Sequence, residues 1–342
     1  MADPTEKVAI GDTGVTVTRL GLGSTPFGNL LSEVSDEDAA QSIEAAWNLG
    51  IRYYDTAPFY GYGLAEERIG MGLRPHNRSD FALSSKVGRL VRKGPRTAAD
   101  EIQENGEPYY YAKPDMMLVS DYSYDAVFRS IEESLTRLGQ DRIDIAYIHD
   151  PDLHFEDTVN GACKALVELR EQGVVKAIGS GMNQWEMLSN FLDHVDFDIV
   201  LLAGRYSLLE QPALESFLPK CIRTGCRVAL GGVFNSGLLA DPRGNATYNY
   251  KAAPSDLVER ALKIESVCKR FDVPLKAAAL QFPLGHEAIA SVLIGVRKAT
   301  EVEENVRLFS TDIPAELWHA LKTEGLLPES CPVPQTLEMT GT

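Results

Sequence analysis

The 342-residue sequence has no pair of cysteines in a C-x-x-C spacing, and its cysteines are odd in number. That pattern predicts reduced thiols in a cytosolic protein and argues against a disulfide framework or a zinc site. No uninterrupted apolar run reaches the ~18 residues of a membrane-spanning helix. The N-terminus, "MADPTEKVAIGDTG", has no basic segment followed by an apolar one. We therefore expect no signal peptide, no membrane association and a cytoplasmic location. The cysteines are Cys163, Cys221, Cys226, Cys268 and Cys331.

Basic residues are also scarce, since 33 Lys and Arg stand against 49 Asp and Glu, for a formal net charge of −16. That balance argues against a broad basic surface for nucleic acid or anionic membranes. We expect a monomer or a small homo-oligomer. The chain also lacks a Gly-x-Gly-x-x-Gly turn, internal repeats and low-complexity tracts. Hydrophobic residues make up 44% of it, which is enough for a sizeable core.

Short apolar runs rich in Val, Ile, Tyr and Leu recur along the chain, and longer segments with helical spacing lie between them. Eight such runs predict a closed parallel (β/α)8 TIM barrel over about residues 18–310 of a single domain, 1–342. A doubly wound open sheet is the alternative, but it usually has fewer strands and a Gly-x-Gly-x-x-Gly turn. The expected strands are 18–23, 52–57, 81–87, 143–150, 175–181, 198–204, 226–232 and 291–296.

Three segments fall outside this alternation. Residues 8–17 predict a β-hairpin, turning at Asp12–Gly14, that plugs the bottom of the barrel. Residues 89–122 have no helical period, so we expect a long irregular loop after the third strand, of the kind that is usually functional or mobile. Tyr109 to Tyr111 within it are expected to help close the substrate pocket, with ordinary packing as the alternative. The Pro-rich tail, about 325–342, is expected to be irregular.

Polar residues stand at the ends of three consecutive predicted strands. Asp55 ends the second strand, with Tyr60 in the loop behind it, while Lys86 ends the third and His149 the fourth. In a barrel, the carboxyl ends of the strands meet at one rim, where catalytic residues lie. Each residue alone has a structural explanation, such as a helix cap for Asp55 or a packed core position for His149. Their joint occurrence on adjacent strands predicts an active site.

These residue types together are typical of a tuned proton donor. A free Tyr titrates near ~10, so it is a poor base and a slow acid at neutral pH. A cation beside the phenol favours the phenolate and lowers that pKa. Lys86 can supply the cation, Asp55 can keep it charged and oriented, and His149 can hydrogen-bond the substrate oxygen. Because the set contains no nucleophile and no metal cage, a second molecule must complete the reaction, and a nicotinamide hydride fits.

The segments around these residues resemble the aldo-keto reductase superfamily. "DTAPFYGYGLAEERIG" is similar to that family's D-T-A-x-x-Y-G-x-x-x-x-E-x-x-x-G segment, "SSKVG" to its strand-three lysine and "IDIAYIHDPD" to its strand-four histidine. "GLGSTPFG" and "LIGVRKATEVEEN" are similar to its first-strand and C-terminal cofactor motifs, so the resemblance covers roughly residues 8–310. It implies Tyr60 as general acid/base, tuned by Asp55, Lys86 and His149, and an NAD(P) bound across the rim without a Rossmann fold.

The resemblance also implies which residues contact the ligands. The substrate contacts are expected to be Phe59, Tyr60, His149 and Asn183. The cofactor contacts are expected to be Gly23, Ser24, Thr25, Asp55, Asn183, Gly231, Gly237, Leu238, Gly295, Val296, Arg297, Glu301, Glu304 and Asn305.

Several positions depart from the family's common pattern. Many members hold the carboxamide with a Ser-Asn pair after strand five and a Gln on strand six. This chain has Gly181, Met182 and Ala203 there, with Asn183 one residue on, and Gly231 where an aromatic often stacks on nicotinamide. These departures, with "IHDPD" and "LLAGRYSLLEQ", resemble the sugar-dehydrogenase branch. That branch holds L-fucose, L-galactose and D-threo-aldose dehydrogenases and the related pyridoxal 4-dehydrogenase.

The register of "GVRKATEVEEN" bears on the choice between NAD and NADP. It places Glu301 where NADPH-preferring members often have a phosphate-binding Arg. A carboxylate there would repel a 2′-phosphate or accept a hydrogen bond from a free 2′-OH, so NAD is favoured over NADP. Arg297 and Lys298 could still serve NADP, and Glu301 could simply be a first-turn residue of a solvated helix.

We therefore predict an NAD(P)-dependent oxidoreductase that acts on a small aldose, oxidised at C1 to a lactone, or on an aldehyde. A non-catalytic, cofactor-sensing regulatory subunit of the same fold is the alternative, and the intact set of four residues argues against it. A metal-dependent barrel hydrolase using His149, Asp150 and His154 is a third hypothesis, although their spacing is poor for one metal. We expect no metal.

Overall fold

The computed structural model describes residues 1–98, 101–244, 247–249 and 251–334. Within these ranges, parallel strands close into a barrel in the order β10-β11-β14-β3-β4-β5-β8-β9. The predicted (β/α)8 barrel is confirmed. Its strands are β3 (Leu20–Gly23), β4 (Tyr53–Asp55), β5 (Ala82–Val87), β8 (Ile145–His149), β9 (Ala177–Met182), β10 (Ile199–Ala203), β11 (Arg227–Gly231) and β14 (Ile289–Gly295).

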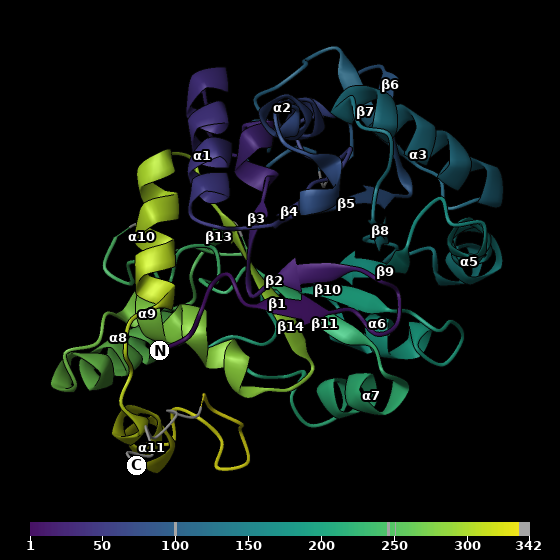
Figure 1. Ribbon diagram of the computed structural model, residues 1–342. Coiled ribbons are helices and arrows are strands. Elements are labelled where there is room, and N and C mark those ends of the chain that lie inside the picture. Colours follow the sequence, from purple (N-terminus) through teal and green to yellow (C-terminus); the bar gives the residue numbers. More distant parts are fainter. Residues whose placement is uncertain (99–100, 245–246, 250, 335–342) are drawn as a thin grey trace.

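Helices surround the outside of the barrel (Figure 1). Helix α1 packs against both α2 and α10, so the ring closes between the first and the last barrel helix. The helices are α1 (Asp36–Asn48), α2 (Leu64–Leu73), α3 (Tyr124–Leu138), α4 (Phe155–Asp157), α5 (Cys163–Glu171), α6 (Trp185–Phe191), α7 (Phe217–Thr224), α8 (Ser255–Arg270), α9 (Leu275–Gln281), α10 (Ala299–Phe309) and α11 (Ala315–Thr323). Single turns are η1 (Thr25–Gly28), η2 (Arg78–Asp80), η3 (Thr158–Ala162) and η4 (Phe282–Gly285).

Local sequence signals explain where several helices begin and end. Helix α1 begins after Ser35, whose hydroxyl accepts a hydrogen bond from the backbone N–H of Asp38, and its first turn is acidic. Helix α3 ends at Gly139 and α7 at Gly225, which have φ of +60° and +74°. Glycine adopts this left-handed conformation without steric penalty, so it stops the helix.

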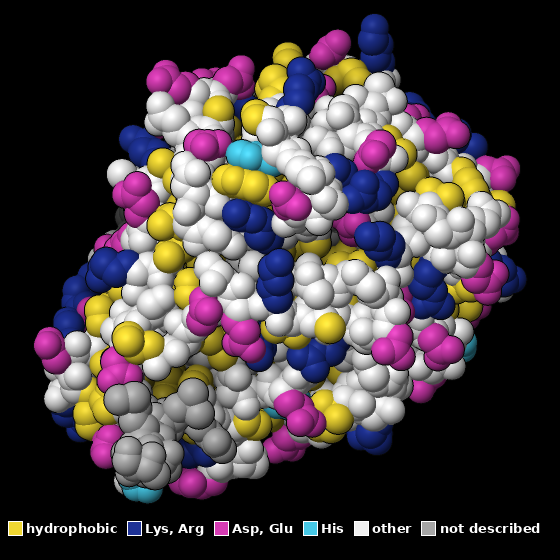
Figure 2. Space-filling model, in the orientation of Figure 1, with side chains coloured by type: hydrophobic (Ala, Val, Ile, Leu, Met, Phe, Trp, Pro, Cys, Tyr) yellow, Lys and Arg dark blue, Asp and Glu magenta, His cyan; other side chains and the backbone are white. Residues whose placement is uncertain are grey.

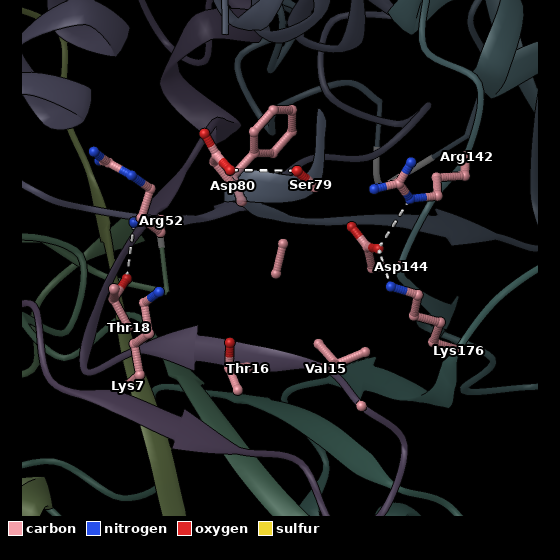
Figure 3. Close-up of a pocket in the computed structure, with 13 residues that line it drawn as sticks. Lys7, Val15, Thr16, Thr18, Arg52, Ser79, Asp80, Arg142, Asp144 and Lys176 are labelled. Carbon is pink, nitrogen blue, oxygen red and sulfur yellow. Dashed lines mark hydrogen bonds and ion pairs between the residues drawn. The ribbon is translucent and has the colours of Figure 1, made fainter. Parts of the chain in front are cut away.

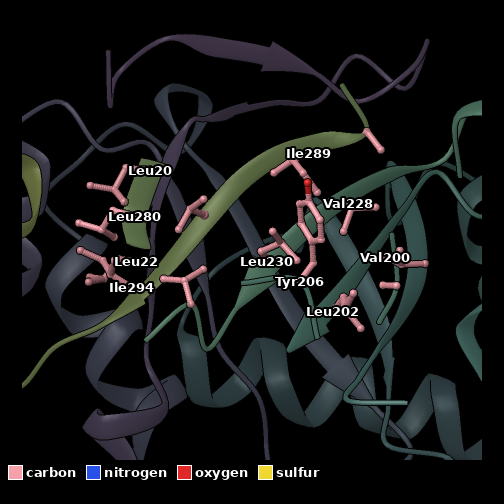
Figure 4. Close-up of a cluster of buried hydrophobic side chains, with 14 of the residues drawn as sticks. Leu20, Leu22, Val200, Leu202, Tyr206, Val228, Leu230, Leu280, Ile289 and Ile294 are labelled. Carbon is pink, nitrogen blue, oxygen red and sulfur yellow. The ribbon is translucent and has the colours of Figure 1, made fainter. Parts of the chain in front are cut away.

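The strands are buried on both faces, which explains their nearly continuous apolar sequences. Leu20 and Leu22 of β3 and Val228 and Leu230 of β11 point outward, into the layer between barrel and helices (Figure 4). Ala229, between the last two, faces the barrel interior instead. Side chains two residues apart therefore share a face, and this alternation determines which residues line the inside of the barrel.

The N-terminal hairpin predicted over 8–17 is confirmed. Strand β1 (Lys7–Ala9) pairs antiparallel with β2 (Thr16–Thr18), with Val8 opposite Val17. The side chains of Val8, Ile10, Val15 and Val17 pack together with residues of the barrel interior, so the hairpin closes that end.

A pocket lies between this hairpin and the barrel (Figure 3). Its lining includes Arg52, Ala82 and Lys176, which stand at the starts of β4, β5 and β9. The carboxylate of Asp144 in its wall forms ion pairs with Arg78 at 2.6 Å and with Arg142 and Lys176 at 3.6 Å, so its charge is paired within the protein. This pocket is at the opposite end of the barrel from the predicted active site.

The segment after the third barrel strand is long, as predicted, but it is not irregular throughout. Strand β6 (Arg89–Lys93) pairs antiparallel with β7 (Met116–Ser120). Between them, Arg96 donates hydrogen bonds to the carbonyls of Tyr110 and Met116, at 3.0 Å each, and lies 3.9 Å from the ring of Tyr62. The expectation of a wholly irregular loop was therefore wrong, because this ribbon depends on pairing between segments distant in sequence.

The remaining described segments add little to the barrel. Strands β12 (Thr247–Tyr248) and β13 (Lys251–Ala252) form a short antiparallel pair. Residues 324–334 contain no helix or strand, and the rest of the predicted tail, 335–342, lies outside the described residues.

On the face seen in Figure 2, acidic and basic side chains are interspersed. Of the helices in the described ranges, none is long and apolar enough to cross a membrane.

Candidate active site

The structure brings the four predicted catalytic residues together. Asp55 and His149 are the last residues of β4 and β8, and Lys86 lies near the end of β5, the strand between them. Lys86 Nζ lies 2.7 Å from Asp55 Oδ2 and 4.8 Å from the centroid of the Tyr60 ring. The rings of Tyr60 and His149 are edge to face, with centroids 5.7 Å apart. One polar cluster thus occupies the rim.

Glycines explain how the turn that carries Tyr60 reaches this position. A Cβ atom on Gly28 would lie only 2.5 Å from the carbonyl carbon of Tyr60, and one on Gly61 would collide with the Gly28 oxygen. Gly61 also has φ of +66°. The two backbones touch directly, so a side chain at either position would displace Tyr60.

Lys86 is held as a buried cation. Its ammonium donates hydrogen bonds to Asp55 Oδ2 at 2.7 Å and to the carbonyl of Thr56 at 2.9 Å, while Ser84 Oγ donates to Asp55 Oδ1 at 2.7 Å. Burial lowers the pKa of Lys86, but the charges and hydrogen bonds of Asp55 and Tyr60 outweigh that effect and the pKa is raised. Lys86 therefore stays protonated at neutral pH.

The phenol of Tyr60 is subject to opposing effects. Burial raises its pKa, the positive charge of Lys86 lowers it, and the negative charge of Asp55 raises it again. Hydrogen bonds with Thr25 and Lys86 lower the pKa further, yet the net direction is upward. Lys86 acts in the predicted direction, but it offsets the effect of burial without exceeding it.

His149 is neutral. Burial lowers its pKa well below the ordinary value, and the positive charges of Lys86 and Arg89 act in the same direction. Its Nδ1 atom is buried and has no hydrogen-bond partner among the described residues, and its Nε2 atom lies 3.6 Å from Asp150 Oδ2. A neutral imidazole at this rim can donate a hydrogen bond to a substrate oxygen.

Aromatic rings surround the mouth of the site. The ring of Phe59, a predicted substrate contact, lies 5.5 Å from that of His149. Tyr110 is buried, and its ring lies 5.4 Å from that of Phe59 and 6.4 Å from that of Tyr60. Tyr110, the middle residue of Tyr109 to Tyr111, thus packs against the turn that carries Tyr60.

Two charged residues lie at the same mouth: Arg89, which the sequence analysis missed, and Asp150, which it considered only as a metal ligand. The guanidinium of Arg89 lies 5.5 Å from the Phe59 ring centroid and donates to the Asp150 carbonyl at 3.3 Å. Asp150 has φ of +41°, and the Tyr122 hydroxyl supports its turn, lying 2.7 and 2.8 Å from the carbonyls of His149 and Asp150. Both residues lie within two positions of the end of a barrel strand, β5 or β8, and that spacing could have indicated them as site residues.

The part of the rim that continues from His149 is lined by residues with little or no side chain. Gly181, Ala203 and Gly231 stand at or near the ends of the neighbouring strands β9, β10 and β11. A Cβ atom on Gly181 would lie 3.6 Å from Lys86 Cε, directly beside the predicted catalytic cluster. Asn183 Nδ2 is already engaged, since it donates to the Ala203 carbonyl at 2.9 Å.

Polar groups expected to contact the cofactor also lie where the first and last barrel strands end. Ser24 is fully buried, and its hydroxyl has no hydrogen-bond partner among the described residues. It follows Gly23, which is paired with Gly295 of β14, and it precedes Thr25. A buried hydroxyl without a partner, next to two glycines that leave the backbone uncovered, can hydrogen-bond the polar groups of a dinucleotide. These residues therefore fit the expected cofactor. Val296 is buried behind them.

The remaining predicted cofactor contacts are engaged within the protein. Glu301 Oε2 accepts a hydrogen bond from the backbone N–H of Arg297 at 2.8 Å, as in a helix cap, and the Arg297 guanidinium donates to the Leu30 carbonyl at 2.6 Å. Glu304 pairs with Lys276 of α9 at 3.1 Å. Asn305 donates to the Glu301 carbonyl, the backbone N–H groups of Gly237 and Leu238 close a turn, and the Leu238 side chain is buried.

A metal centre finds no support in the part of the chain that the structure describes, where no group of three or more His, Cys, Asp or Glu could hold a metal ion. His154 lies 3.7 Å from Asp157 and packs against the Tyr122 ring, with centroids 5.1 Å apart. It does not join His149 and Asp150 in a ligand set.

Fold and site together define a barrel oxidoreductase with a Tyr-Lys-Asp-His cluster. The sequence profile of the Aldo/keto reductase family matches residues 19–323, and the chain belongs to that family. Proteins of this family use NAD or NADP and act on small aldehydes or sugars, which confirms the coarse prediction of a nicotinamide-dependent oxidoreductase.

Curated relatives match over nearly their whole length. The chain is 42% identical to pyridoxal 4-dehydrogenase of Microbacterium luteolum over 336 residues, covering 94% of this chain and 98% of the relative. It is 39% identical to D-threo-aldose 1-dehydrogenase of a Pseudomonas species over 323 residues, with the same coverage. L-galactose dehydrogenase of Arabidopsis thaliana is 29% identical over 304 residues, covering 87% of this chain and 86% of the relative. The predicted branch is thus confirmed by its relatives.

Solved structures share the fold at lower identity. An aldo-keto reductase from Bacillus halodurans superimposes with a TM-score of 0.73 at 24% identity, covering 93% of this chain and 96% of the other. The glycerol dehydrogenase of Gluconobacter oxydans gives 0.72 at 19% identity, covering 98% and 99%.

Proposed function

We propose that the protein is an NAD(P)-dependent dehydrogenase that oxidises a small aldose at C1, and in reverse reduces a small aldehyde. The observation that carries this proposal is the position of Lys86, wedged between the Asp55 carboxylate and the Tyr60 ring. Asp55 is the one ion-pair partner that the described residues give this cation, and the ammonium lies where it stabilises a phenolate. The relatives that act on an aldose or an aldehyde support the same chemistry.

The side chains divide the proton chemistry between them. Tyr60 takes the proton of the anomeric hydroxyl, and neutral His149 donates a hydrogen bond to the same oxygen. Lys86 compensates the negative charge of the phenolate that accepts this proton, and Asp55 keeps Lys86 in place. A bound nicotinamide supplies the acceptor for the hydride from C1. An aldose that reacts in its ring form leaves as a lactone.

The mouth of the site suits a compact, hydroxylated substrate. The Phe59 ring offers an apolar face, while the nearby Arg89 and the carboxylate of Asp150 offer a cation and an anion for hydroxyl groups. The nicotinamide binds beside the cluster, at the ends of the neighbouring strands, where Gly181, Ala203 and Gly231 have little or no side chain. Glu301 at the start of α10 favours NAD over NADP, since its carboxylate opposes a 2′-phosphate.

The test is a substrate screen that follows the absorbance of reduced nicotinamide. L-fucose, L-galactose, D-arabinose and pyridoxal are offered with NAD and NADP, and aldehydes with NADH and NADPH. We expect turnover of at least one sugar or aldehyde, with Tyr60→Phe as the matched inactive control and no loss of activity in a chelator. If every substrate fails while NAD(P)H binds, the protein is instead the cofactor-sensing, non-catalytic form of this fold.

A further inference from the structure

Below the proposed catalytic cluster lies a second layer of polar groups inside the barrel. Tyr53, Ser84 and Tyr147 precede Asp55, Lys86 and His149 by two residues on β4, β5 and β8. Because side chains two residues apart share a face of a strand, these hydroxyls point into the same interior, one layer down. All three residues are fully buried, at 0% exposure. Most interior positions around them are apolar, so their hydroxyls need an explanation.

The three hydroxyls form one chain that ends on Asp55. The Tyr147 and Tyr53 oxygens are 3.0 Å apart, Tyr53 Oη and Ser84 Oγ are 3.3 Å apart, and Ser84 Oγ lies 2.7 Å from Asp55 Oδ1. The Tyr54 carbonyl, 3.5 Å from Ser84 Oγ, is a more distant acceptor. The other carboxylate oxygen of Asp55 accepts from Lys86. Asp55 is thus held between the hydroxyl chain and the cation.

One order of the protons satisfies all three contacts of this chain. A carboxylate only accepts, so Ser84 gives its single proton to Asp55. Ser84 Oγ is also placed to donate to Tyr53 at 3.3 Å, but the shorter contact with Asp55 takes its one proton, so we assign Tyr53 as the donor to Ser84 and Tyr147 as the donor to Tyr53. Burial, followed by the charge of Asp55, raises the pKa of Tyr53, and burial raises that of Tyr147, so both keep their protons. Every O–H dipole therefore points toward Asp55, and aligned hydrogen bonds strengthen one another.

We propose that Tyr147, Tyr53 and Ser84 are positioning residues whose aligned hydroxyls anchor Asp55 and draw its negative charge away from Tyr60, which favours the phenolate. This inference rests on the proposed role of Tyr60. Asp55 opposes ionisation of the phenol and Lys86 promotes it, so dispersing the charge of Asp55 lets Lys86 prevail. The chain acts through its dipoles, because within the described residues Tyr147 has no hydrogen-bond partner beyond Tyr53 to pass a proton onward.

The groups that face the Tyr60 phenol come from four segments of the chain. Lys86 from β5 and Asp55 from β4 carry the charges that it senses, while His149 from β8 is neutral because burial lowers its pKa. Tyr110, from the long segment after β5, packs beside it as a ring. A change confined to the interior hydroxyls therefore reaches Tyr60 through Asp55.

The test compares Ser84→Ala, Tyr147→Phe and the double variant in the oxidative direction over a range of pH. Removing either hydroxyl should move the alkaline midpoint of kcat upward. At neutral pH we expect kcat to fall about tenfold for Ser84→Ala, the scale of one hydrogen bond to a charged group, and about threefold for Tyr147→Phe. The double variant should match Ser84→Ala, since Tyr147 acts only through Ser84. The KM for the cofactor should not change.

Tyr54→Phe is the matched control. Tyr54 lies next to Tyr53 on the same strand and is equally buried, but its hydroxyl donates to the Ile51 carbonyl at 3.1 Å, on the helix side. Its pH profile should be that of the wild type. An unmoved midpoint in Tyr147→Phe, which loses a single oxygen, or strictly additive losses in the double variant would overturn the chain. Either result with an inactive Tyr60→Phe leaves the proposed function standing, whereas an active Tyr60→Phe removes that function's basis.

Discussion

Replacing Lys86 by Met tests the central electrostatic argument, because Met keeps much of the bulk and removes the charge. Lys86 Nζ lies 4.8 Å from the Tyr60 ring centroid. With the phenolate charge placed at the ring centroid, two unit charges about 4.8 Å apart interact by about 3.5 kcal/mol at an effective dielectric constant near 20, which corresponds to about 2.5 pH units. The alkaline midpoint of kcat in the oxidative direction should rise by about that much, and kcat at neutral pH should fall by at least about 10²-fold, with partial recovery under alkaline conditions.

The design must separate catalysis from folding. Lys86→Met leaves Asp55 as a buried, unpaired carboxylate, which costs about 3–5 kcal/mol of stability. The double variant Lys86→Met/Asp55→Asn removes both charges, so it should fold better and still show the raised midpoint. Asp55→Asn alone should give a smaller displacement, because it disturbs Lys86 without removing it. Thermal unfolding of each variant confirms which are folded, and a wild-type midpoint in the folded double variant would leave Lys86 with a structural role only.

Three other outcomes follow from the site. Tyr60→Phe should lower kcat by at least about 10²-fold while cofactor affinity stays near the wild-type value, and near-normal turnover would remove Tyr60 from its role. Glu301→Arg should raise the NADP to NAD ratio of kcat/KM, and Glu301→Gln, which keeps an acceptor for the Arg297 N–H, should raise it less; an unchanged ratio would mean that Glu301 does not face the ribose. Burial lowers the pKa of His149 and of His286, so below about pH 6.5 the unfolded chain binds protons that the folded protein does not. The free energy of unfolding, measured in urea, should therefore fall on acidification by up to about 1.4 kcal/mol per pH unit for each histidine, and His149→Gln should make the fall shallower.

The grouping of the four proposed catalytic residues was predictable because its signals are local. Asp55, Lys86 and His149 each end or nearly end an apolar strand, and parallel strands of a barrel bring those ends to one rim. The hairpin was predictable for the same reason, since its strands adjoin one short turn. The fold needed only the alternation of strand and helix.

What the sequence did not reveal depends on three-dimensional neighbours. The β6–β7 ribbon pairs Lys93 with Met116 across a long insertion, and no local pattern specifies such pairing. The net direction of the Tyr60 pKa depends on burial, which overcomes a cation that the sequence did identify. Glu304 was predicted to contact the cofactor from its position in α10, but its carboxylate forms an ion pair with Lys276 of the neighbouring helix.

The direct contact between Gly28 and Gly61 has a mechanical consequence. The loop after β3, with Ser24 and Thr25, and the turn with Tyr60 touch backbone to backbone, so neither can shift without pushing the other. Thr25 also hydrogen-bonds the Tyr60 phenol. A ligand that binds against the first strand should therefore also move the proposed proton donor, Tyr60, and the two segments can accept sequence changes only as a matched pair.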